Sequence, residues 1–445
     1  MKFVADLHLH SKYSRAVSGN MTLSNMASWA SIKGINVIAS GDFTHPFWFD
    51  DLKNELKEVG NGLYKLKRKR AEINGFDSSK LSTDDISFLL SCEISSIYSQ
   101  GGKGRRIHNL FIFPSLSSVE KFNKELVKRR VNLRSDGRPI VGLSSRDLAE
   151  IALSCDEKCL IIPAHIWTPW FSLFGSFSGF DSVEECFADF SDKIFGIETG
   201  LSSDPLMNWS VGDLEERAIL SFSDAHSLEK MGREATVFEA KDISYDSIYK
   251  AICGKSLEFK VAFTIEFYPE EGKYHYTGHR NCNTRLSPRE TKEKGEVCPV
   301  CGKGLTVGVM HRVEDLKTQE SEVVIKETGG VRWKYSANNR PPYVSLVPLM
   351  EIIAEAFSVG VGSKKVREVY AALVNSFGSE FNVLLRAETD RIGKIAGERL
   401  GDAIKRVRTG NIVVEPGFDG VFGKVRIWDE ETTSGEQNES QLNLF

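Results

Sequence analysis

Residues 1 to about 262 alternate short apolar runs with longer amphipathic patterns. Residues 22–34, 117–130 and 145–153 place apolar side chains at helical spacing behind a serine or threonine, which predicts helices. Seven apolar runs rich in β-branched and aromatic residues predict strands. They are KFVADLHLH (2–10), INVIASGDFTH (35–45), ISFLLSCEIS (86–95), RIHNLFIFPS (106–115), CLIIPAH (159–165), IFGIETG (194–200) and AILSFSDAH (218–226). Repeated strand and helix units predict an α/β fold whose parallel sheet closes as a barrel.

The pattern changes after this region. Residues 263–325 are rich in turn formers and carry three of the eight cysteines, which predicts a small zinc-binding module. Residues 326–430 are predicted to form a mainly helical domain, and residues 431–445 a disordered polar tail. With residues 1–262 as a barrel, this division agrees with the two to four domains expected for a chain of 445 residues.

Composition narrows the possible partners. Lysine and arginine number 57 against 61 aspartate and glutamate, so the net charge of −4 excludes a globally basic surface, and a nucleic-acid site must be a local patch. The sequence shows no signal peptide and no apolar run of the ~20 residues that span a bilayer, so we expect a cytoplasmic protein without a membrane partner. Scattered cysteines with one CxxC pair indicate metal binding or burial rather than disulfides.

Potential metal ligands stand at or near one end of each predicted strand. His8 and His10 are two positions apart, so both side chains of an extended strand point to one face. His108 opens its run, and it must reach the others from the preceding loop or from a strand of opposite direction. Because the C-terminal strand ends of a barrel converge on one mouth, we expect the candidates to meet there. They are His8, His10, Asp42, His45, Glu93, His108, His165, Glu198, Asp224 and His226.

This set of side chains favours metal-assisted hydrolysis of a phosphoester. Imidazole with carboxylate suits zinc, manganese or iron, and a carboxylate such as Glu93 can bridge two ions. Neighbouring divalent ions polarise a phosphoryl oxygen and generate hydroxide at neutral pH. A single histidine is more simply a hydrogen-bonded structural residue, but six of the nine histidines lie at the ends of strand-like runs.

A second metal site is predicted in the turn-rich segment. His279 and Cys282 form an HxxC pair, and Cys298 and Cys301 form a CxxC pair after fifteen intervening residues. Two ligand pairs on two tight turns suit a closed tetrahedral shell, so we expect one structural zinc ion. His275 is the weaker candidate for the fourth ligand.

The C-terminal part and one aromatic segment are candidates for DNA contact. IGKIAGERLGDAIKRVRTG (392–410) resembles half of a helix-hairpin-helix, whose glycine turn offers N–H groups to a phosphate, and KLKRKR (65–70) is another basic run. The aromatic segment 167–180 follows His165 and could stack on a base extruded from a duplex. Solvated helix faces and core packing are the alternatives. The expected contacts are Tyr13, Ser14, Trp167, Trp170, Phe171, Lys364, Lys365, Lys405 and Arg406.

The final QLNLF resembles the QLxLF peptide by which bacterial proteins bind the DNA polymerase sliding clamp. Leu442, Leu444 and Phe445 would fill an apolar pocket, and Gln441 would make polar contacts. A frayed tail is the alternative, but exposed Leu and Phe without a partner would be a liability.

The ligand order HxH, Asp with His, Glu, His, His and DxH resembles the PHP (polymerase and histidinol phosphatase) family. The resemblance implies a distorted (β/α)7 barrel with two or three divalent ions (Zn, Mg or Mn), and makes Glu198 and Asp6 residues that orient ligand imidazoles. It implies one ion at His8, His10, Glu93 and Asp224, a second at Glu93, His108 and His165, and a third at Asp42, His45 and His226.

Two points separate this chain from related patterns. Many PHP members have TDH where this chain has GDFTH, so Asp42, His45 or both are candidate ligands of the third ion. Amidohydrolases also begin with HxH on a first barrel strand, but they finish with one aspartate and lack the mid-chain glutamate.

The motifs DLHLHSKYS, SGDFTHP, FSDAH, GHRNC, CPVCGK and EPGFDGVFG resemble the endonuclease Q family of DNA-repair nucleases. The resemblance implies a metal-dependent endonuclease that nicks DNA 5′ of uracil, hypoxanthine, xanthine and abasic sites, with Asp224, Glu93, His8 and His10 as catalytic residues. A PHP phosphatase of small molecules, a non-catalytic clamp-bound adaptor and a base deaminase are the rival functions.

Overall fold

The computed structural model describes residues 1–68, 75–77, 82–254, 256 and 258–429. Within these ranges no helix is long and apolar enough to cross a membrane. The tail 431–445 with its QLNLF end, and residues 69–70 of the basic run, lie outside the described residues.

Thirteen strands of the described residues form one mixed sheet. They are β1 (Lys2–Asp6), β2 (Val37–Ala39), β3 (Leu56–Glu58), β4 (Tyr64–Leu66), β5 (Ser87–Gln100), β6 (Lys103–Phe113), β7 (Ile140–Val141), β8 (Leu160–Pro163), β11 (Ala235–Glu239), β12 (Lys260–Glu266), β15 (Val323–Thr328), β16 (Val331–Ser336) and β17 (Tyr343–Ser345). The path runs β15-β16-β17-β12-β11-β1-β2-β5-β4-β3, with β6 and β7 paired to β5, and β8 to β6.

Three smaller strand pairs lie outside this sheet. They are β9 (Gly196–Glu198) with β10 (Ala218–Leu220), β13 (Thr277–His279) with β14 (Thr284–Leu286), and β18 (Val413–Glu415) with β19 (Lys424–Arg426). All seven strands predicted from the sequence are therefore present. The pairing leaves β9 and β10 as a separate sheet, so the closed seven-stranded barrel stays an expectation.

The predicted direction of the strands is wrong in part. β1, β2 and β5 are parallel, as expected, but β6 runs antiparallel to both β5 and β8, and β11 runs antiparallel to β1 and β12. A strand that is buried on both faces is apolar whatever its direction, so the pattern does not distinguish the two cases. His108 reaches the site from the oppositely directed strand β6.

The three predicted helices are present and begin at polar caps. The side chains of Thr22, Ser115 and Ser144 accept hydrogen bonds from the first turns of α1, α3 and α4, which satisfies free N–H groups at the helix starts. The α-helices are α1 (Leu23–Lys33), α2 (Pro46–Glu55), α3 (Leu116–Lys128), α4 (Ser145–Cys155), α5 (Val183–Phe187), α6 (Pro205–Trp209), α7 (Tyr245–Ile252), α8 (Pro288–Lys294), α9 (Val309–Leu316), α10 (Leu349–Ala356), α11 (Lys364–Phe377), α12 (Glu380–Leu385), α13 (Thr389–Ala396) and α14 (Glu398–Thr409).

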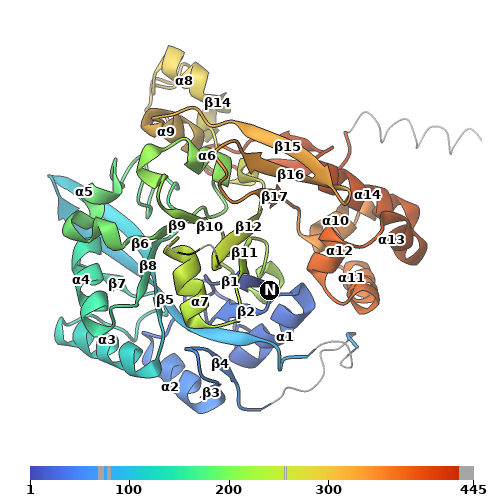
Figure 1. The fold of residues 1–445 in the computed structure, drawn as a ribbon. Coiled ribbons are helices and arrows are strands. Elements are labelled where there is room, and N and C mark those ends of the chain that lie inside the picture. The colour runs from blue at the N-terminus through green and yellow to red at the C-terminus, as the bar shows by residue number, and fades with distance from the viewer. Residues whose placement is uncertain (69–74, 78–81, 255, 257, 430–445) are drawn as a thin grey trace, which may run out of the picture.

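The C-terminal helices pack on the main body rather than standing apart from it. One cluster of buried side chains includes Met26 of α1, Leu373 of α11 and Leu400 of α14. Lys33 and Glu380 form an ion pair of 2.7 Å across this contact, and both are buried. Figure 1 shows α10–α14 gathered on one side of the molecule and α3–α5 on the other.

The boundary expected between residues 325 and 326 falls inside β15. β15, β16 and β17 continue the main sheet through the parallel pairing of β17 with β12. The helical part therefore begins at α10, and a sheet extension lies between it and the turn-rich segment.

Candidate metal centre

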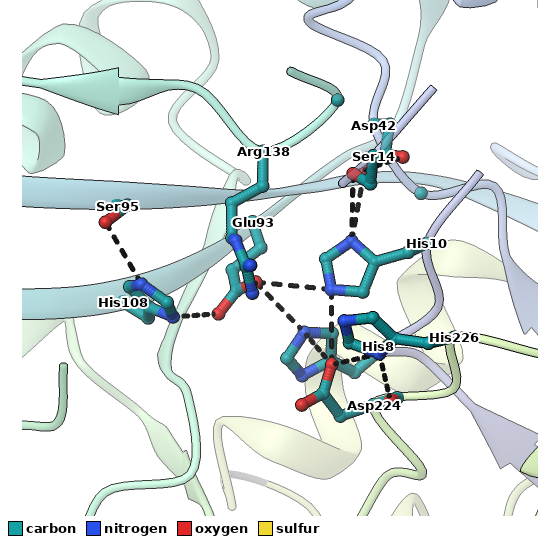
Figure 2. Close-up of polar contacts among 12 residues, drawn as sticks. His8, His10, Ser14, Asp42, Glu93, Ser95, His108, Arg138, Asp224 and His226 are labelled. Carbon is teal, nitrogen blue, oxygen red and sulfur yellow. Dashed lines mark hydrogen bonds and ion pairs between the residues drawn. The ribbon is translucent and has the colours of Figure 1, made fainter. Parts of the chain in front are cut away.

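The first group of candidate ligands gathers around the ends of β1 and the middle of β5. The ligand atoms of His8, His10, Glu93 and Asp224 all lie within 4.8 Å of one another. Nε2 of His10 is 3.3 Å from Oε2 of Glu93 and 3.2 Å from Oδ1 of Asp224. Nε2 of His8 is 3.6 Å and 3.5 Å from the same two oxygens. Figure 2 shows the four side chains pointing toward one another.

The geometry of this group fits a divalent ion. Nε2 of His8, Nε2 of His10 and Oδ1 of Asp224 are buried and have no hydrogen-bond partner within the described part of the chain. Buried polar atoms without partners are costly, and three that converge on one point are satisfied together by a cation. Two imidazoles and two carboxylates are a donor set for zinc or manganese.

The second group shares Glu93 with the first. The ligand atoms of Glu93, His108 and His165 also lie within 4.8 Å of one another. Oε1 of Glu93 is 2.6 Å from Nδ1 of His108 and 3.2 Å from Nε2 of His165, whereas its Oε2 faces the first group. Each carboxylate oxygen thus serves a different group, which is the arrangement of a carboxylate that bridges two ions.

Two buried carboxylates orient the imidazoles of the first group. Nδ1 of His8 donates to Glu198 (2.9 Å), and Nδ1 of His10 donates to Asp42 (3.1 Å), so Nε2 of each ring is left for an ion. The other oxygen of Asp42 accepts hydrogen bonds from Ser11 and Ser14. Glu198 has the orienting role expected for it. Asp42, expected as a candidate ligand, accepts hydrogen bonds from His10 and from two serines.

Asp6 does not contact an imidazole, which corrects the expectation for it. Its carboxylate accepts hydrogen bonds from the Ser223 N–H (3.0 Å), the Ser223 hydroxyl (2.6 Å) and the Gly232 N–H (3.0 Å). Burial raises the pKa of Asp6 to about 6. The residue anchors the loop that carries Asp224 and His226.

The expected third ligand group is not assembled among the described residues. His226 lies against His10, with ring centroids 4.7 Å apart, and its Nδ1 donates to the Asp224 carbonyl (2.9 Å). His45 precedes α2 and stacks on Tyr13, with centroids 4.5 Å apart and planes 17° apart. With Asp42 held by His10, the structure brings His226 to the site but directs His45 toward the aromatic ring of Tyr13.

Three residues of the centre have left-handed backbone geometry. Asp42, His165 and Asp224 have φ values of 49°, 31° and 46°. This region is unfavourable for residues other than glycine, and such strain concentrates at functional sites, where the surrounding contacts hold it.

The environment of the centre shifts the pKa values of its carboxylate and imidazole groups in opposite directions. Burial acts to raise the pKa of Glu93, but His108 and Arg138 outweigh it and hold that pKa well below its usual range. Burial acts to lower the pKa of His8, but Glu198 and Asp224 outweigh it and raise that pKa well above its usual value. Ions that enter the site therefore displace protons from it.

Arg138 is a member of the centre that sequence analysis missed. Its Nη1 is 3.1 Å from Oε2 of Glu93, and a quarter of its side chain is exposed. Arginine is not a metal ligand, so a search for ligand types passes over it. The neighbouring Gly137 and Pro139 mark a constrained loop, but they do not indicate where that loop lies.

The residues expected to contact DNA have different environments. Trp167 is fully buried and donates from Nε1 to Asn208 (2.8 Å), and buried Ser14 donates to Asp42, so neither is available to DNA. Trp170 stacks on half-exposed Phe177, with centroids 4.7 Å apart. Phe171 lies 4.9 Å from the ring of His108. The aromatic segment thus supplies both core packing and rings beside the metal centre.

The four zinc-ligand candidates of the turn-rich segment come together. The ligand atoms of His279, Cys282, Cys298 and Cys301 lie within 4.8 Å of one another. A hydrogen bond from Thr284 contributes most to lowering the pKa of Cys298 to about 6, which favours the thiolate that binds metal. His275 is buried against Tyr276 and is not part of the group. Four protein ligands leave no open position, as in a structural site.

The glycine turn of the predicted hairpin joins α13 to α14. Gly397 has φ of 100°, and a Cβ at Gly401 would lie 2.8 Å from the Thr389 carbonyl, so both positions require glycine.

The basic residues expected to contact DNA lie on helices or pair with neighbouring groups. Exposed Lys405 lies on α14 with Arg406, whose Nε donates to Asp402 (2.7 Å). On α11, exposed Lys364 pairs with Glu368, and Lys365 lies over Phe357. Of the basic run 65–70, Lys65 and Lys67 donate to main-chain carbonyls.

Replacement of Asp42 by asparagine is expected to weaken binding of Zn²⁺ or Mn²⁺ about 10–100-fold, because the neutral amide no longer raises the basicity of His10. Titration calorimetry against a competing chelator measures the affinity. Asp192→Asn, at an exposed position, is the matched control. Equal affinities of wild type and Asp42→Asn would show that His10 does not depend on this contact.

Known proteins match parts of this chain in sequence. The family model of the MJ0043 C-terminal domain matches residues 348–411, which include the α13–α14 hairpin. Protein MJ0043 of Methanocaldococcus jannaschii is 32% identical over 266 residues, which cover 58% of this chain and 31% of that protein. The chain therefore spans less than a third of the length of that relative.

Two solved structures match nearly the whole chain. The lesion-specific endonuclease PfuEndoQ from Pyrococcus furiosus is 32% identical with a TM-score of 0.79, over 98% of this chain and 99% of that one. An endonuclease Q complex with a 27-mer duplex that has an abasic lesion at the active site is 33% identical, also with a TM-score of 0.79, over 97% and 98% of the two chains. The chain belongs to the endonuclease Q family.

Proposed function

We propose that the protein is a metal-dependent DNA-repair endonuclease that hydrolyses the phosphodiester 5′ of deaminated bases (uracil, hypoxanthine and xanthine) and abasic sites. The observation that carries the proposal is the bridging geometry of Glu93, whose two oxygens face two separate groups of buried ligand atoms. The lesion-specific endonuclease and the endonuclease Q complex with an abasic lesion support the endonuclease activity and the abasic substrate. The deaminated bases and the 5′ position of the cut rest on the sequence resemblance alone.

The bound ions and Asp224 have distinct tasks in this reaction. Divalent ions held there (Zn, Mg or Mn) would supply Lewis acidity and lower the pKa of water. Burial acts to raise the pKa of Asp224, but His8 and His10 outweigh it and lower that pKa. The carboxylate is thus ionised at neutral pH. Its side chain is a quarter exposed, so an attacking water can reach it, and we assign to it the role of proton acceptor.

Entry of the lesion is proposed to occur by extrusion of the damaged nucleotide. Weakened pairing at a lesion lowers the unstacking cost, which is a few kcal/mol. Tyr13, stacked on His45, and Phe171, beside His108, place aromatic rings at two sides of the metal centre. Half-exposed Phe47 extends the first ring pair, with its centroid 6.3 Å from that of Tyr13. These rings are our candidates for contact with the extruded base.

Other parts of the chain are proposed to hold the DNA and recruit the enzyme. The glycine turn at Gly397, with Lys405 and Arg406 on α14 and Lys364 and Lys365 on α11, would contact backbone phosphates. A structural zinc ion would hold the segment around β13 and β14. The terminal peptide QLNLF, whose sequence alone supports this role, would bind the bacterial sliding clamp, which implies a cytoplasmic, nucleoid-associated enzyme.

Strand cleavage on a defined lesion tests the proposal. Duplexes with one uracil, hypoxanthine or abasic site are incubated with Mg²⁺, Mn²⁺ or Zn²⁺, with and without chelator, and resolved on a denaturing gel. We expect one nick 5′ of the lesion, with 3′-hydroxyl and 5′-phosphate ends, and no nick with chelator. An unbroken strand that is still bound would favour an adaptor, and a converted base in an intact strand would favour a deaminase.

A further inference from the structure

Arg138 brings a fixed positive charge into the metal centre. Its Nη1 lies 3.1 Å from Oε2 of Glu93, the oxygen that also faces Nε2 of His8 and of His10. Figure 2 shows its side chain reaching Glu93 beside the two histidines and Asp224. Oε2 of Glu93 would therefore contact both Arg138 and an ion bound between the histidines.

The loop that carries Arg138 is held on both sides by residues of the centre. A Cβ at Gly137 would lie 2.5 Å from Oγ of Ser14 and 2.6 Å from Cγ of Asp42, so the chain passes in direct contact with the support of His10. Gly137 also donates from its N–H to the Tyr13 carbonyl (3.0 Å). On the other side, Ser95 of β5 donates from its N–H to the Pro139 carbonyl (3.0 Å). The Arg138 backbone is therefore held in place by contacts of the residues on both sides of it.

A carboxylate that binds an ion has less charge to offer an arginine. An ion between His8, His10, Glu93 and Asp224 would attract Oε2 of Glu93 and repel the guanidinium. Arginine carries five N–H donors in a planar fork that suits phosphate oxygens, and it stays charged at any working pH. A phosphodiester beside the ions would supply the anion that the guanidinium then lacks.

We propose that Arg138 is a catalytic residue that binds a non-bridging oxygen of the scissile phosphate and stabilises the charge that develops there during cleavage. The inference rests on the proposed nuclease function. The role assigned to Arg138 goes beyond the neutralisation of Glu93. The two roles can be distinguished, because loss of a residue that only neutralised Glu93 would change the number of bound ions and not the contact with the phosphate.

Kinetics and metal analysis of Arg138→Gln and Arg138→Lys form the first test. We expect Arg138→Gln to lower single-turnover cleavage about 10²–10³-fold, the usual loss for one preorganised donor to a developing oxyanion. Arg138→Lys should recover part of the rate, since it keeps the charge but not the planar fork. Both should bind the wild-type number of ions by mass spectrometry. Arg146→Gln is the matched control. It removes an arginine of α4 that pairs with Asp189, and it should leave cleavage unchanged.

Binding to a modified substrate gives a second readout, independent of turnover. A duplex with a neutral methylphosphonate at the scissile position removes the oxygen charge that Arg138 would contact. The affinities for the methylphosphonate duplex and for the unmodified duplex are compared in Ca²⁺ by fluorescence anisotropy. Wild type and Arg146→Gln should bind the methylphosphonate duplex more weakly than the unmodified one. Arg138→Gln, which already lacks the contact, should bind the two duplexes with similar affinity. An equal loss in all three proteins, or ion-depleted Arg138 variants, would overturn the inference. A wild-type protein that does not cut any lesion would instead overturn the proposed function.

Discussion

Replacement of Asp224 by asparagine should lower the single-turnover rate of nicking at least ~10³-fold. The change removes one anionic ligand of the first group and the proposed proton acceptor. Loss of several kcal/mol of charge stabilisation at a metal centre corresponds to a rate loss of this size. Rates on a uracil or abasic duplex at saturating enzyme measure the effect, and binding to the same duplex should change little.

The control for this substitution is Asp192→Asn, which makes the same chemical change at a side chain that is 67% exposed and pairs with Lys193. It should cut at the wild-type rate. If Asp224→Asn also cut at that rate, Asp224 would be neither an essential ligand nor the proton acceptor, and the assignment of the first ligand group would be wrong.

Replacement of Cys298 by serine should remove one zinc ion per chain and unfold the segment around β13 and β14. Zinc supplies about 10–16 kcal/mol of apparent binding free energy in small zinc-binding peptides, and that energy is folding energy. This segment has little apolar core, since its own buried cluster consists of Leu286, Cys298 and Leu305. Elemental analysis and hydrogen exchange of residues 277–306 measure the two effects.

The effect should spread to a second segment and spare the main sheet. The Arg280 N–H and the Thr306 hydroxyl donate to the Asp419 carboxylate, and Phe418 forms a β-bridge with Tyr276. The turn near residue 419 should therefore lose exchange protection as well. Cys155→Ser, at a half-buried cysteine of α4, is the matched control with unchanged zinc content. Full zinc retention by Cys298→Ser would indicate that the ion is held by other residues or is absent.

Local patterns predicted the elements well, for physical reasons. The apolar runs that form β1, β5 and β6 are buried on both faces over most of their length, and the caps of α1, α3 and α4 depend on serine or threonine at the helix start. Strand direction was not predictable in the same way, because β11 and β12 return antiparallel through loops whose paths depend on distant packing. Burial leaves the same apolar pattern in either direction.

The sequence by itself determined which residue types could form the centre and where the strand runs that carry them lie. Only the tertiary structure decided how those residues divide the work. The antiparallel pairing of β5 with β6 sets His108 beside Glu93, and the parallel pairing of β1 with β2 is followed by loops in which Asp42 contacts His10. Arg138 enters through a loop about 45 residues from Glu93, and local periodicity carries no information on contacts at that separation. Side-chain chemistry is local, whereas the geometry that brings candidate ligands and their hydrogen-bond partners together arises from long-range packing.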